Sequence, residues 1–332
     1  MMRFRRMLAV LGVVGASLAG PAGPAQAQPS ADQVMTEMGL SAGDRQRVVN
    51  GEFVTTEVGA VSERDLSFAI AFLLRASPDV LGKQEVAGEH ITADSEVQQY
   101  GRFSPAGSLA DLAGLQITTD EASTLSNAQP GEALNLSTGE IAAFQALRGR
   151  APAAVQQQLQ RMLLARYQAY RGAGLAGIAP YDRGGSATEV AEDLRRASQA
   201  AKGGLQKYMP AFHAVLLGYP KATVPGMREH FFWVKYAIQG KPTYVLTHVL
   251  VAADGVARAV VSRQFYVSTG YNGEQAIAAF LPVQGGTVAT YESHAFTDQV
   301  AGFGSWAKRS IGSRIMAAQM KKMFEAERRM VR

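Results

Sequence analysis

The fold of this chain is decided by residues 243–267, Thr-Tyr-Val-Leu-Thr-His-Val-Leu-Val-Ala-Ala-Asp-Gly-Val-Ala-Arg-Ala-Val-Val-Ser-Arg-Gln-Phe-Tyr-Val. Two runs rich in β-branched and aromatic residues flank Asp254-Gly255, a dipeptide that favours the two-residue turn of a β-hairpin. Similar runs span residues 229–239, 275–283 and 287–296, with turns at 240–242 and 285–286. Five strands joined by short turns within about 70 residues predict an antiparallel meander.

Alternation along these strands assigns their side chains to the two faces of the sheet. Both faces are largely apolar, so we expect both to be covered by other elements. One face is expected to carry Phe231, Trp233, Lys235, Tyr244, Leu246, His248, Val261, Arg263 and Phe265, and the other Phe232, Val234, Tyr236, Val245, Val249, Val251, Val260 and Tyr266.

A long helix is predicted from about Ser305 to Met330, roughly 40 Å at 1.5 Å per residue. Helical spacing places an apolar arc on one side and cationic residues on the other. The arc comprises Ile311, Ile315, Met316, Met320, Met323 and Phe324, and the opposite side carries Arg314, Lys321 and Arg328. We expect this helix to cover one face of the sheet and helices from the first half to cover the other.

The first half of the chain is richer in helix signals. Residues 153–171 carry apolar side chains at helical spacing, and Ser137-Thr-Gly-Glu140 is a capping box that opens a helix to about residue 147. Further helices are expected at 119–126, 188–201 and 205–217, and strands at 51–58, 97–103, 112–117 and 133–136. Residues 65–76 form one apolar run, which fits either a buried strand or a buried helix.

These patterns predict an α+β fold, with a helix-rich N-terminal half and an antiparallel meander closed by the C-terminal helix. Two prolines and two glycines between Gly218 and Gly226 favour a boundary there. We therefore divide the chain into residues 1–27, a helix-rich region at 28–218, and the sheet with its helix at 219–332. Because both faces of the sheet need a cover, we expect the last two regions to form one coupled globular unit.

The first 27 residues have the pattern of a signal peptide. A basic start is followed by an apolar run over residues 7–18 and by Ala25-Gln26-Ala27, which fits cleavage near Ala27. The sequence has no cysteine, which excludes disulfides, thiol catalysis and a cysteine-linked lipid anchor. We therefore expect an exported, soluble protein of the periplasm or the medium.

The formal net charge of +5 is unevenly placed. Three arginines lie in the predicted signal peptide, and residues 302–332 hold eight Lys/Arg against two Glu. The remainder is acidic, which argues against a general nucleic-acid-binding surface. A basic helix with an apolar face can also make transient contact with an anionic membrane surface, although packing on the sheet accounts for the same pattern.

The hairpin ending in Gly285-Gly-Thr-Val-Ala-Thr-Tyr291, followed by a linker and a long helix, resembles the helix-grip fold of the START-like lipid-binding superfamily. The stretch Thr297-Asp-Gln-Val-Ala-Gly-Phe-Gly-Ser-Trp306 also resembles a group of exported bacterial proteins. The first resemblance covers about the last 105 residues. It implies a cavity between a curved sheet and the C-terminal helix that holds a hydrophobic ligand.

Candidate site residues follow from the aromatic-rich face of the sheet. Apolar pockets usually carry a few polar groups that orient the ligand, and the expected ligand-binding residues are Trp233, Lys235, Tyr244, His248, Arg263 and Phe265. The linker residues Thr297, Asp298 and Gln299 are expected either at the pocket mouth or as a cap of the following helix.

Metal and nucleophile motifs are absent from the sequence. Of the five histidines, His230, His248 and His294 lie on predicted strands, but alternation puts the first two on opposite faces and no His-Glu-x-x-His spacing occurs. We therefore expect no metal and no cofactor. The leading hypothesis is a monomeric, non-enzymatic binder of a hydrophobic small molecule or lipid. The alternatives are an enzyme that acts on such a ligand through His248 and Arg263, and a structural or partner-binding protein with a filled core.

Overall fold

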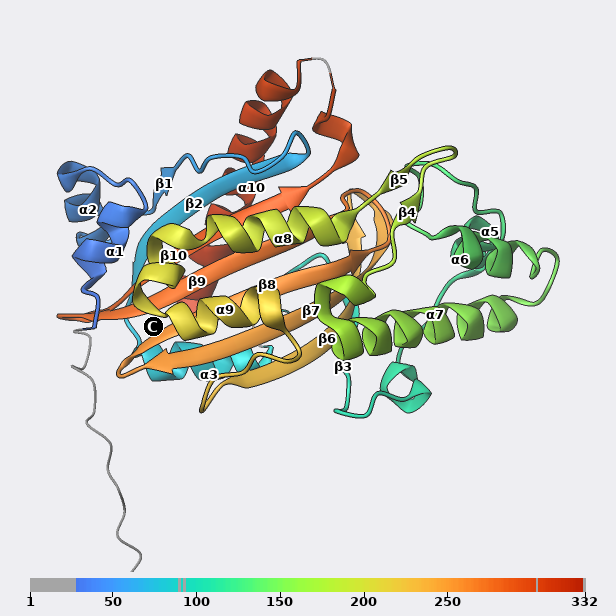
Figure 1. Ribbon diagram of the computed structural model, residues 1–332, viewed down its shortest axis with the longest axis horizontal. Helices are drawn as coiled ribbons and strands as arrows, with labels where there is room; N and C mark the ends of the chain where they lie inside the picture. Colours follow the sequence, from blue (N-terminus) through green and yellow to red (C-terminus); the bar gives the residue numbers. More distant parts are fainter. Residues whose placement is uncertain (1–27, 89–90, 92–93, 303, 331–332) are drawn as a thin grey trace, which may run out of the picture.

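The computed structural model describes residues 28–88, 91, 94–302 and 304–330. The predicted signal peptide lies outside the described residues. An eight-stranded antiparallel sheet, in the order β1-β2-β10-β9-β8-β7-β6-β3, forms the middle layer (Figure 1). The α+β prediction is confirmed.

Five of these strands are the predicted meander. They are β6 (Arg228–Ile238), β7 (Lys241–Asp254), β8 (Ala257–Val267), β9 (Gly273–Val283) and β10 (Gly286–Phe296). The β7–β8 turn is closed by Asp254 paired with Ala257, so the turn residues are Gly255 and Val256. Gly255 has φ +52°, a value that glycine adopts without strain.

N-terminal strands complete both edges of the meander. β2 (Asp65–Leu74) pairs with β10, and β1 (Val54–Thr56) pairs with β2. At the other edge β3 (Val97–Arg102) pairs with β6. The apolar run at 65–76 is therefore a strand, and nine of its ten strand residues are buried, which explains why it does not alternate.

Helices cover both faces of the sheet (Figure 1). One face packs against α7 (Pro152–Ala173), α8 (Val190–Ala200) and α9 (Pro210–Gly218), with α5 (Thr119–Ser126) and α6 (Thr138–Gln145) beyond them. α1 (Ala31–Glu37) and α2 (Ala42–Val49) pack at one end of this face. The opposite face packs against α3 (Pro78–Ala87) and α10 (Ser305–Met330). We call these the α8 face and the α10 face.

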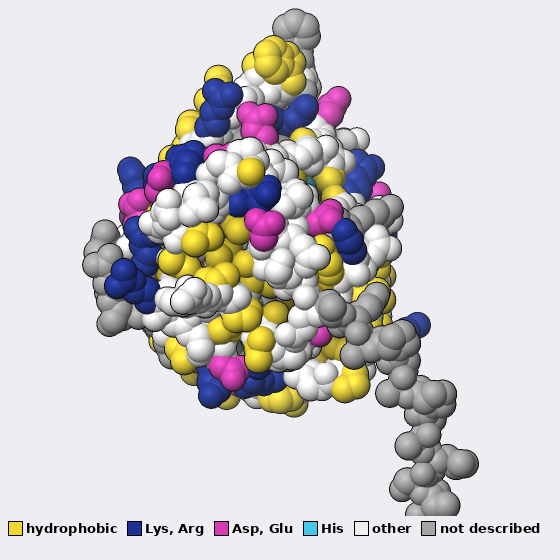
Figure 2. Space-filling model, turned by 90° about the vertical axis from the view of Figure 1, so that its left-hand side faces the viewer, with side chains coloured by type: hydrophobic (Ala, Val, Ile, Leu, Met, Phe, Trp, Pro, Cys, Tyr) yellow, Lys and Arg dark blue, Asp and Glu magenta, His cyan; other side chains and the backbone are white. Residues whose placement is uncertain are grey.

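A single apolar cluster on the α8 face joins residues from both sides of the predicted boundary. It includes Phe103, Leu159 and Tyr170 from the first half and Trp233 and Phe265 from the sheet. Seen from the α1–α2 end, hydrophobic side chains gather in a hollow with charged side chains around it (Figure 2).

The face assignment holds except at a β-bulge in β8. Leu246 pairs with Tyr266 and Thr247 pairs with Gln264, so Phe265 has no opposite residue. Both Phe265 and Tyr266 are buried in the cluster on the α8 face. The prediction that Tyr266 lies on the opposite face was wrong, because a bulge puts two consecutive residues on one side.

Two predicted short strands are not strands. Residues 112–117 form the end of a 3₁₀ turn (Leu109–Leu112) and an irregular segment, and residues 133–136 are irregular as well. The latter segment still bonds to the sheet, since Asn135 donates its backbone N–H to the oxygen of Ser268 at 2.8 Å. Leu136 also accepts from the Asp182 N–H of β4 at 2.9 Å. These isolated bonds go to different partners and do not form a ladder.

The C-terminal helix has the predicted bounds, but its orientation differs. Met316, Met320 and Phe324 pack on the sheet as expected. Ile311 and Ile315 instead point outward, with 61% and 55% of their surface exposed. Arg328 was expected on the outer side, yet its Nη1 donates to the Gly51 oxygen and its guanidinium lies 4.2 Å from the Phe53 ring centroid.

The helix comes close to β2 near its start. A Cβ atom at Gly312 would lie 2.7 Å from the Cδ2 atom of Leu66, so a larger residue there would require the Leu66 side chain to shift. No described helix combines the length and the apolar composition that a bilayer-spanning segment needs.

Candidate functional site

The expected ligand-binding residues lie together on the α8 face, and they are buried. The Trp233 indole N–H donates to the Asp111 oxygen at 2.7 Å, and the ring packs against Gly101. Lys235 Nζ lies 2.6 Å from Glu121 Oε1, with 5% and 8% of the two side chains exposed. A buried pair of this kind satisfies two charges that would otherwise be costly to hide.

Arg263 is the largest fully buried side chain of the molecule's described part. Its guanidinium donates to Gln275 Oε1 at 2.7 Å, Tyr170 Oη at 3.0 Å, Ser198 Oγ at 3.0 Å and the Leu216 oxygen at 2.9 Å. No acidic residue within the described ranges forms an ion pair with it. Uncharged acceptors therefore hold this cation and tie α7, α8 and α9 to β8 and β9.

A hydrogen-bonded chain continues from Arg263 to the surface. Tyr170 receives a bond from Arg263, so its hydroxyl hydrogen is free to donate to His248 Nδ1 at 3.1 Å. His248 Nε2–H then donates to Glu229 Oε2 at 3.1 Å. Burial outweighs the attraction of Glu229 and lowers the pKa of His248 to about 4, so the imidazole is neutral at pH 7.

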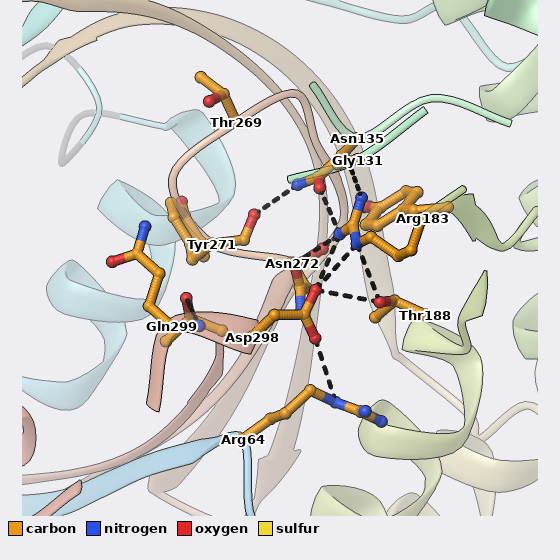
Figure 3. A network of polar contacts seen from close by, with 12 residues as sticks. Arg64, Gly131, Asn135, Arg183, Thr188, Thr269, Tyr271, Asn272, Asp298 and Gln299 are labelled. Carbon is orange, nitrogen blue, oxygen red and sulfur yellow. Dashed lines mark hydrogen bonds and ion pairs between the residues drawn. The ribbon is translucent and has the colours of Figure 1, made fainter. Parts of the chain in front are cut away.

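The linker residues join a second polar network, centred on Arg183 in the turn between β4 (Tyr181–Asp182) and β5 (Ala187–Thr188) (Figure 3). Arg183 donates to Asp298 Oδ2 at 3.0 Å, Asn135 Oδ1 at 2.7 Å, the Gly131 oxygen at 2.8 Å and Asn272 Oδ1 at 3.2 Å. Gln299 Nε2 donates to the Gly270 oxygen at 3.3 Å. Thr297 accepts from the Gln299 N–H, so it caps a short 3₁₀ turn (Asp298–Val300).

These contacts place the predicted residues without assigning them a ligand. The polar groups of Trp233, Lys235, His248 and Arg263 bond to protein atoms, whereas the buried Tyr244 hydroxyl has no hydrogen-bond partner among the described residues. None of the six sheet residues lines either of the two cavities described below. Their ligand-binding role, the mouth role of Thr297–Gln299 and the catalytic role of His248 and Arg263 all stay predictions. What the structure shows is that the two networks fasten the helices and the β10–α10 linker to the sheet.

A groove of about 390 Å³ lies further along the α8 face. Its floor is β8 and β9, where Ala257, Ala259, Ile277, Ala279 and Leu281 alternate toward the helices on the same face as Arg263 and Gln275. One wall is α1 with the residue after it, which contribute Val34 and Met38, and the other is the π-helical turn Lys202–Gln206 with the residues that lead to α9, which contribute Leu205, Tyr208 and Met209. We call this cavity the α1 groove.

The α1 groove exists because small residues stand where the sheet meets the helices. Three alanines on the floor and Gly204 in the wall leave space that longer side chains would fill. Polar residues stand at its edges: Glu37 is paired with Lys207, and Thr290 and Glu292 lie on β10. A mainly apolar cavity with a few polar groups at its edges is typical of small-molecule sites.

A second cavity, of about 550 Å³, lies at the β1–β2 edge of the sheet, between α10 and the start of β2. We call it the edge cleft. Asp65 is one of its lining residues, although its side chain is fully buried, and His294 bonds to the Asp65 carboxylate at 2.8 Å and to Glu292 Oε1 at 3.3 Å. Burial opposes the imidazolium charge, but these two carboxylates prevail and raise the pKa of His294 to about 9.

The histidines do not form a metal site in the described part of the chain. No group of three His, Cys, Asp or Glu side chains there has the geometry to hold a metal ion. His248 and His294 bond to carboxylates, and His230 bonds to Arg102 at 2.9 Å. His90 lies outside the described residues.

Sequence reasoning missed both cavities. Each is built from elements far apart in the chain, so no local pattern marks them. The only available signal was the row of alanines in β8 and β9, which is unusual for a buried strand.

Comparison of the chain with protein-family models, with curated proteins and with solved structures found no match. The resemblance to the START-like superfamily therefore stays a prediction.

Proposed function

We propose that this protein binds a small hydrophobic molecule, such as a short lipid, in the α1 groove. The supporting observation is a mainly apolar cavity of about 390 Å³ between a sheet and helices. Ligand sites of small molecules occupy about 300–1,000 Å³ and are lined mainly by apolar side chains. The ligand would replace water over Ala257, Ala259 and Ala279, and the hydrophobic effect would supply most of the affinity.

The position of the groove favours exchange of the ligand with solvent. One wall is a π-helical turn, Lys202–Gln206, and the other is α1, a helix of seven residues that packs on α2, β9 and this turn. Short elements of this kind open locally at low cost in free energy. The proposed ligand class is the one expected from the sequence. The proposed site is the α1 groove and not the part of the sheet that carries Trp233.

Filling the groove tests this proposal. Ala279→Phe places a ring in the cavity on a strand that tolerates aromatic residues, while Ala142→Phe on the exposed side of α6 is the control. Binding of the neutral fluorescent probe N-phenyl-1-naphthylamine should weaken about tenfold or more in Ala279→Phe and stay within about twofold in the control. Native mass spectrometry of the purified protein should also show a co-purified apolar species that Ala279→Phe loses.

Equal probe binding by wild type and Ala279→Phe would refute the groove as the site. If the wild type binds no probe and carries no co-purified species in several preparations, the partner-binding or structural alternative is favoured. Turnover of a bound ester or amide that His248→Ala abolishes while probe binding persists would favour the enzymatic alternative.

A further inference from the structure

Strand β10 places two hydrogen-bond acceptors side by side at the α1 groove. Thr290 pairs with Ala279 and Glu292 pairs with Ile277, and all four residues line the groove. Directly paired residues on neighbouring strands share a face of the sheet, and residues i and i+2 of one strand lie on that face about 7 Å apart. The side chains of Thr290 and Glu292 are therefore neighbours on the α8 face, toward the helices that enclose the groove.

The Thr290 hydroxyl is buried and has no protein partner. The residue is 5% exposed, it lines the groove, and its side chain forms no hydrogen bond within the described ranges. Buried side-chain polar atoms usually have a partner. A buried, unpaired hydroxyl that faces a cavity therefore points to a polar group on the molecule that fills the cavity.

Glu292 keeps one carboxylate oxygen free for a ligand. Its Oε1 receives a bond from His294 Nε2 at 3.3 Å, whereas Oε2 has no bond within the described part of the chain, and 29% of the side chain is exposed. The fully buried Asp65 carboxylate is the closer partner of the His294 ring, at 2.8 Å from Nδ1. Two carboxylates share one imidazolium, which leaves one negative charge, and Glu292 presents that charge to the groove.

No described cation offsets this charge inside the groove. Arg258 is the one basic residue among the described residues that line it. Arg258 pairs with Phe280 on the α10 face, and its guanidinium forms an ion pair with Asp79 of α3 on that side. Lys207, beside the groove, is paired with Glu37. An anionic ligand would therefore be repelled near Glu292, whereas a cationic one would be attracted.

We propose that the α1 groove selects hydrophobic molecules that carry a primary amine, with the ammonium group between Thr290 and Glu292 and the apolar part over the alanines of β8 and β9. This inference rests on the proposed function and specifies its ligand class. An ammonium group has three N–H donors, so it can bond to Thr290 Oγ1 and to Glu292 Oε2 together. Hydrogen bonds between an ammonium and a carboxylate are stronger than neutral ones, so the amine should bind more tightly than an alcohol of the same length.

The test is displacement of N-phenyl-1-naphthylamine from the full chain at pH 7 by decylamine, 1-decanol and decanoate, each below the concentration at which it forms micelles. The three ligands share one alkyl chain, so differences in affinity report on the polar group alone. Like the side chains of lysine and glutamate, the amine is protonated and the acid is ionised at this pH. Decylamine should bind at least about tenfold more tightly than decanoate, with 1-decanol between them.

Variants assign the preference to the two acceptors. Thr290→Val keeps a similar side-chain shape without the hydroxyl, and it should weaken decylamine about threefold to tenfold while probe binding persists. Glu292→Gln should weaken decylamine about tenfold or more and bring the three decyl ligands within about threefold of one another. Glu63→Gln, at an exposed carboxylate outside the groove lining, is the control and should change each affinity less than about twofold. If Glu292→Gln does not fold by circular dichroism, Thr290→Val and the wild-type order of affinities decide.

The outcomes separate this inference from the proposed function. If the wild type does not bind the probe, the groove fails as a site and the amine preference fails with it. If Ala279→Phe loses the probe but the wild type binds the three decyl ligands within about twofold, or binds decanoate most tightly, the amine preference is overturned and the groove stands. An equal loss of decylamine affinity in Glu63→Gln and Glu292→Gln would assign the preference to general surface charge and overturn it as well.

Discussion

Two buried histidines, His248 and His294, should make the free energy of unfolding depend on pH in opposite directions. The substitution His294→Gln tests the contribution of the His294 charge. His294 has a pKa of about 9 in the folded chain, against about 6.5 for an unperturbed histidine. Because the folded pKa is raised, the imidazolium stabilises the folded state fully below pH 6.5, and this contribution is lost as the pH rises through 9. The difference corresponds to on the order of 3 kcal/mol.

The structural cause of this stabilisation is the pair of carboxylates that face the ring. Nδ1 lies 2.8 Å from Asp65 Oδ2 and Nε2 lies 3.3 Å from Glu292 Oε1, with 2% of His294 exposed. The Asp65 side chain is fully buried, so water screens its contact with the ring little, whereas Glu292 is 29% exposed and contributes less. Glutamine preserves a hydrogen-bond donor of similar reach and removes only the titrating charge.

The assay is urea unfolding of wild type, His294→Gln and His248→Gln from pH 4 to pH 9.5. The difference in unfolding free energy between wild type and His294→Gln should shrink by about 3 kcal/mol between about pH 6 and about pH 9.5. His248→Gln is the matched control: burial lowers the pKa of His248 to about 4, so its contribution is flat above pH 7 and is lost as the pH falls from about 6.5 toward 4. A pH-independent difference for His294→Gln, or the same sign of pH dependence for both variants, would refute the reasoning.

Two further predictions concern the buried ion pair and the outer side of α10. Lys235→Met leaves Glu121 buried without its cation and should lower the free energy of unfolding by about 3–5 kcal/mol. The double variant with Glu121→Gln should recover most of this loss. Urea unfolding measures both variants, and a double variant as unstable as Lys235→Met would contradict the pairing argument. Ile311→Ser combined with Ile315→Ser should leave stability within about 0.5 kcal/mol because both side chains are exposed. If α10 contacts membranes, a smaller fraction of this double variant than of the wild type should sediment with phosphatidylglycerol vesicles. An unchanged fraction would exclude these two residues from such a contact.

Local signals in the sequence predicted most elements of the fold. The capping box at Ser137 opens helix α6, the helix expected at 119–126 is α5, and α10 has the predicted bounds. The Asp254-Gly255 signal led to the correct hairpin, with the turn one residue later. These features depend on hydrogen bonds and side-chain spacing within a few residues, which the sequence displays directly.

Features set by distant contacts could not be predicted. Nothing in residues 65–74 reveals that they pair with β10, and the bulge that turns Tyr266 to the α8 face depends on the fit between β7 and β8. The outward position of Ile311 and Ile315 depends on how α10 packs on the sheet through Met316, Met320 and Phe324. The two cavities could not be predicted either, because the α1 groove and the edge cleft each combine segments from both ends of the chain.

The placement of β2 beside β10 also has a consequence for how the chain reaches its native state. Thr287 pairs with Leu74 and Phe296 with Asp65, so this ladder closes loops of more than two hundred residues. Contacts of such high sequence separation slow folding, because the entropy of loop closure is lost before the ladder forms. Until then the hairpins of the C-terminal third present two long unpaired edges, which are templates for association with other chains.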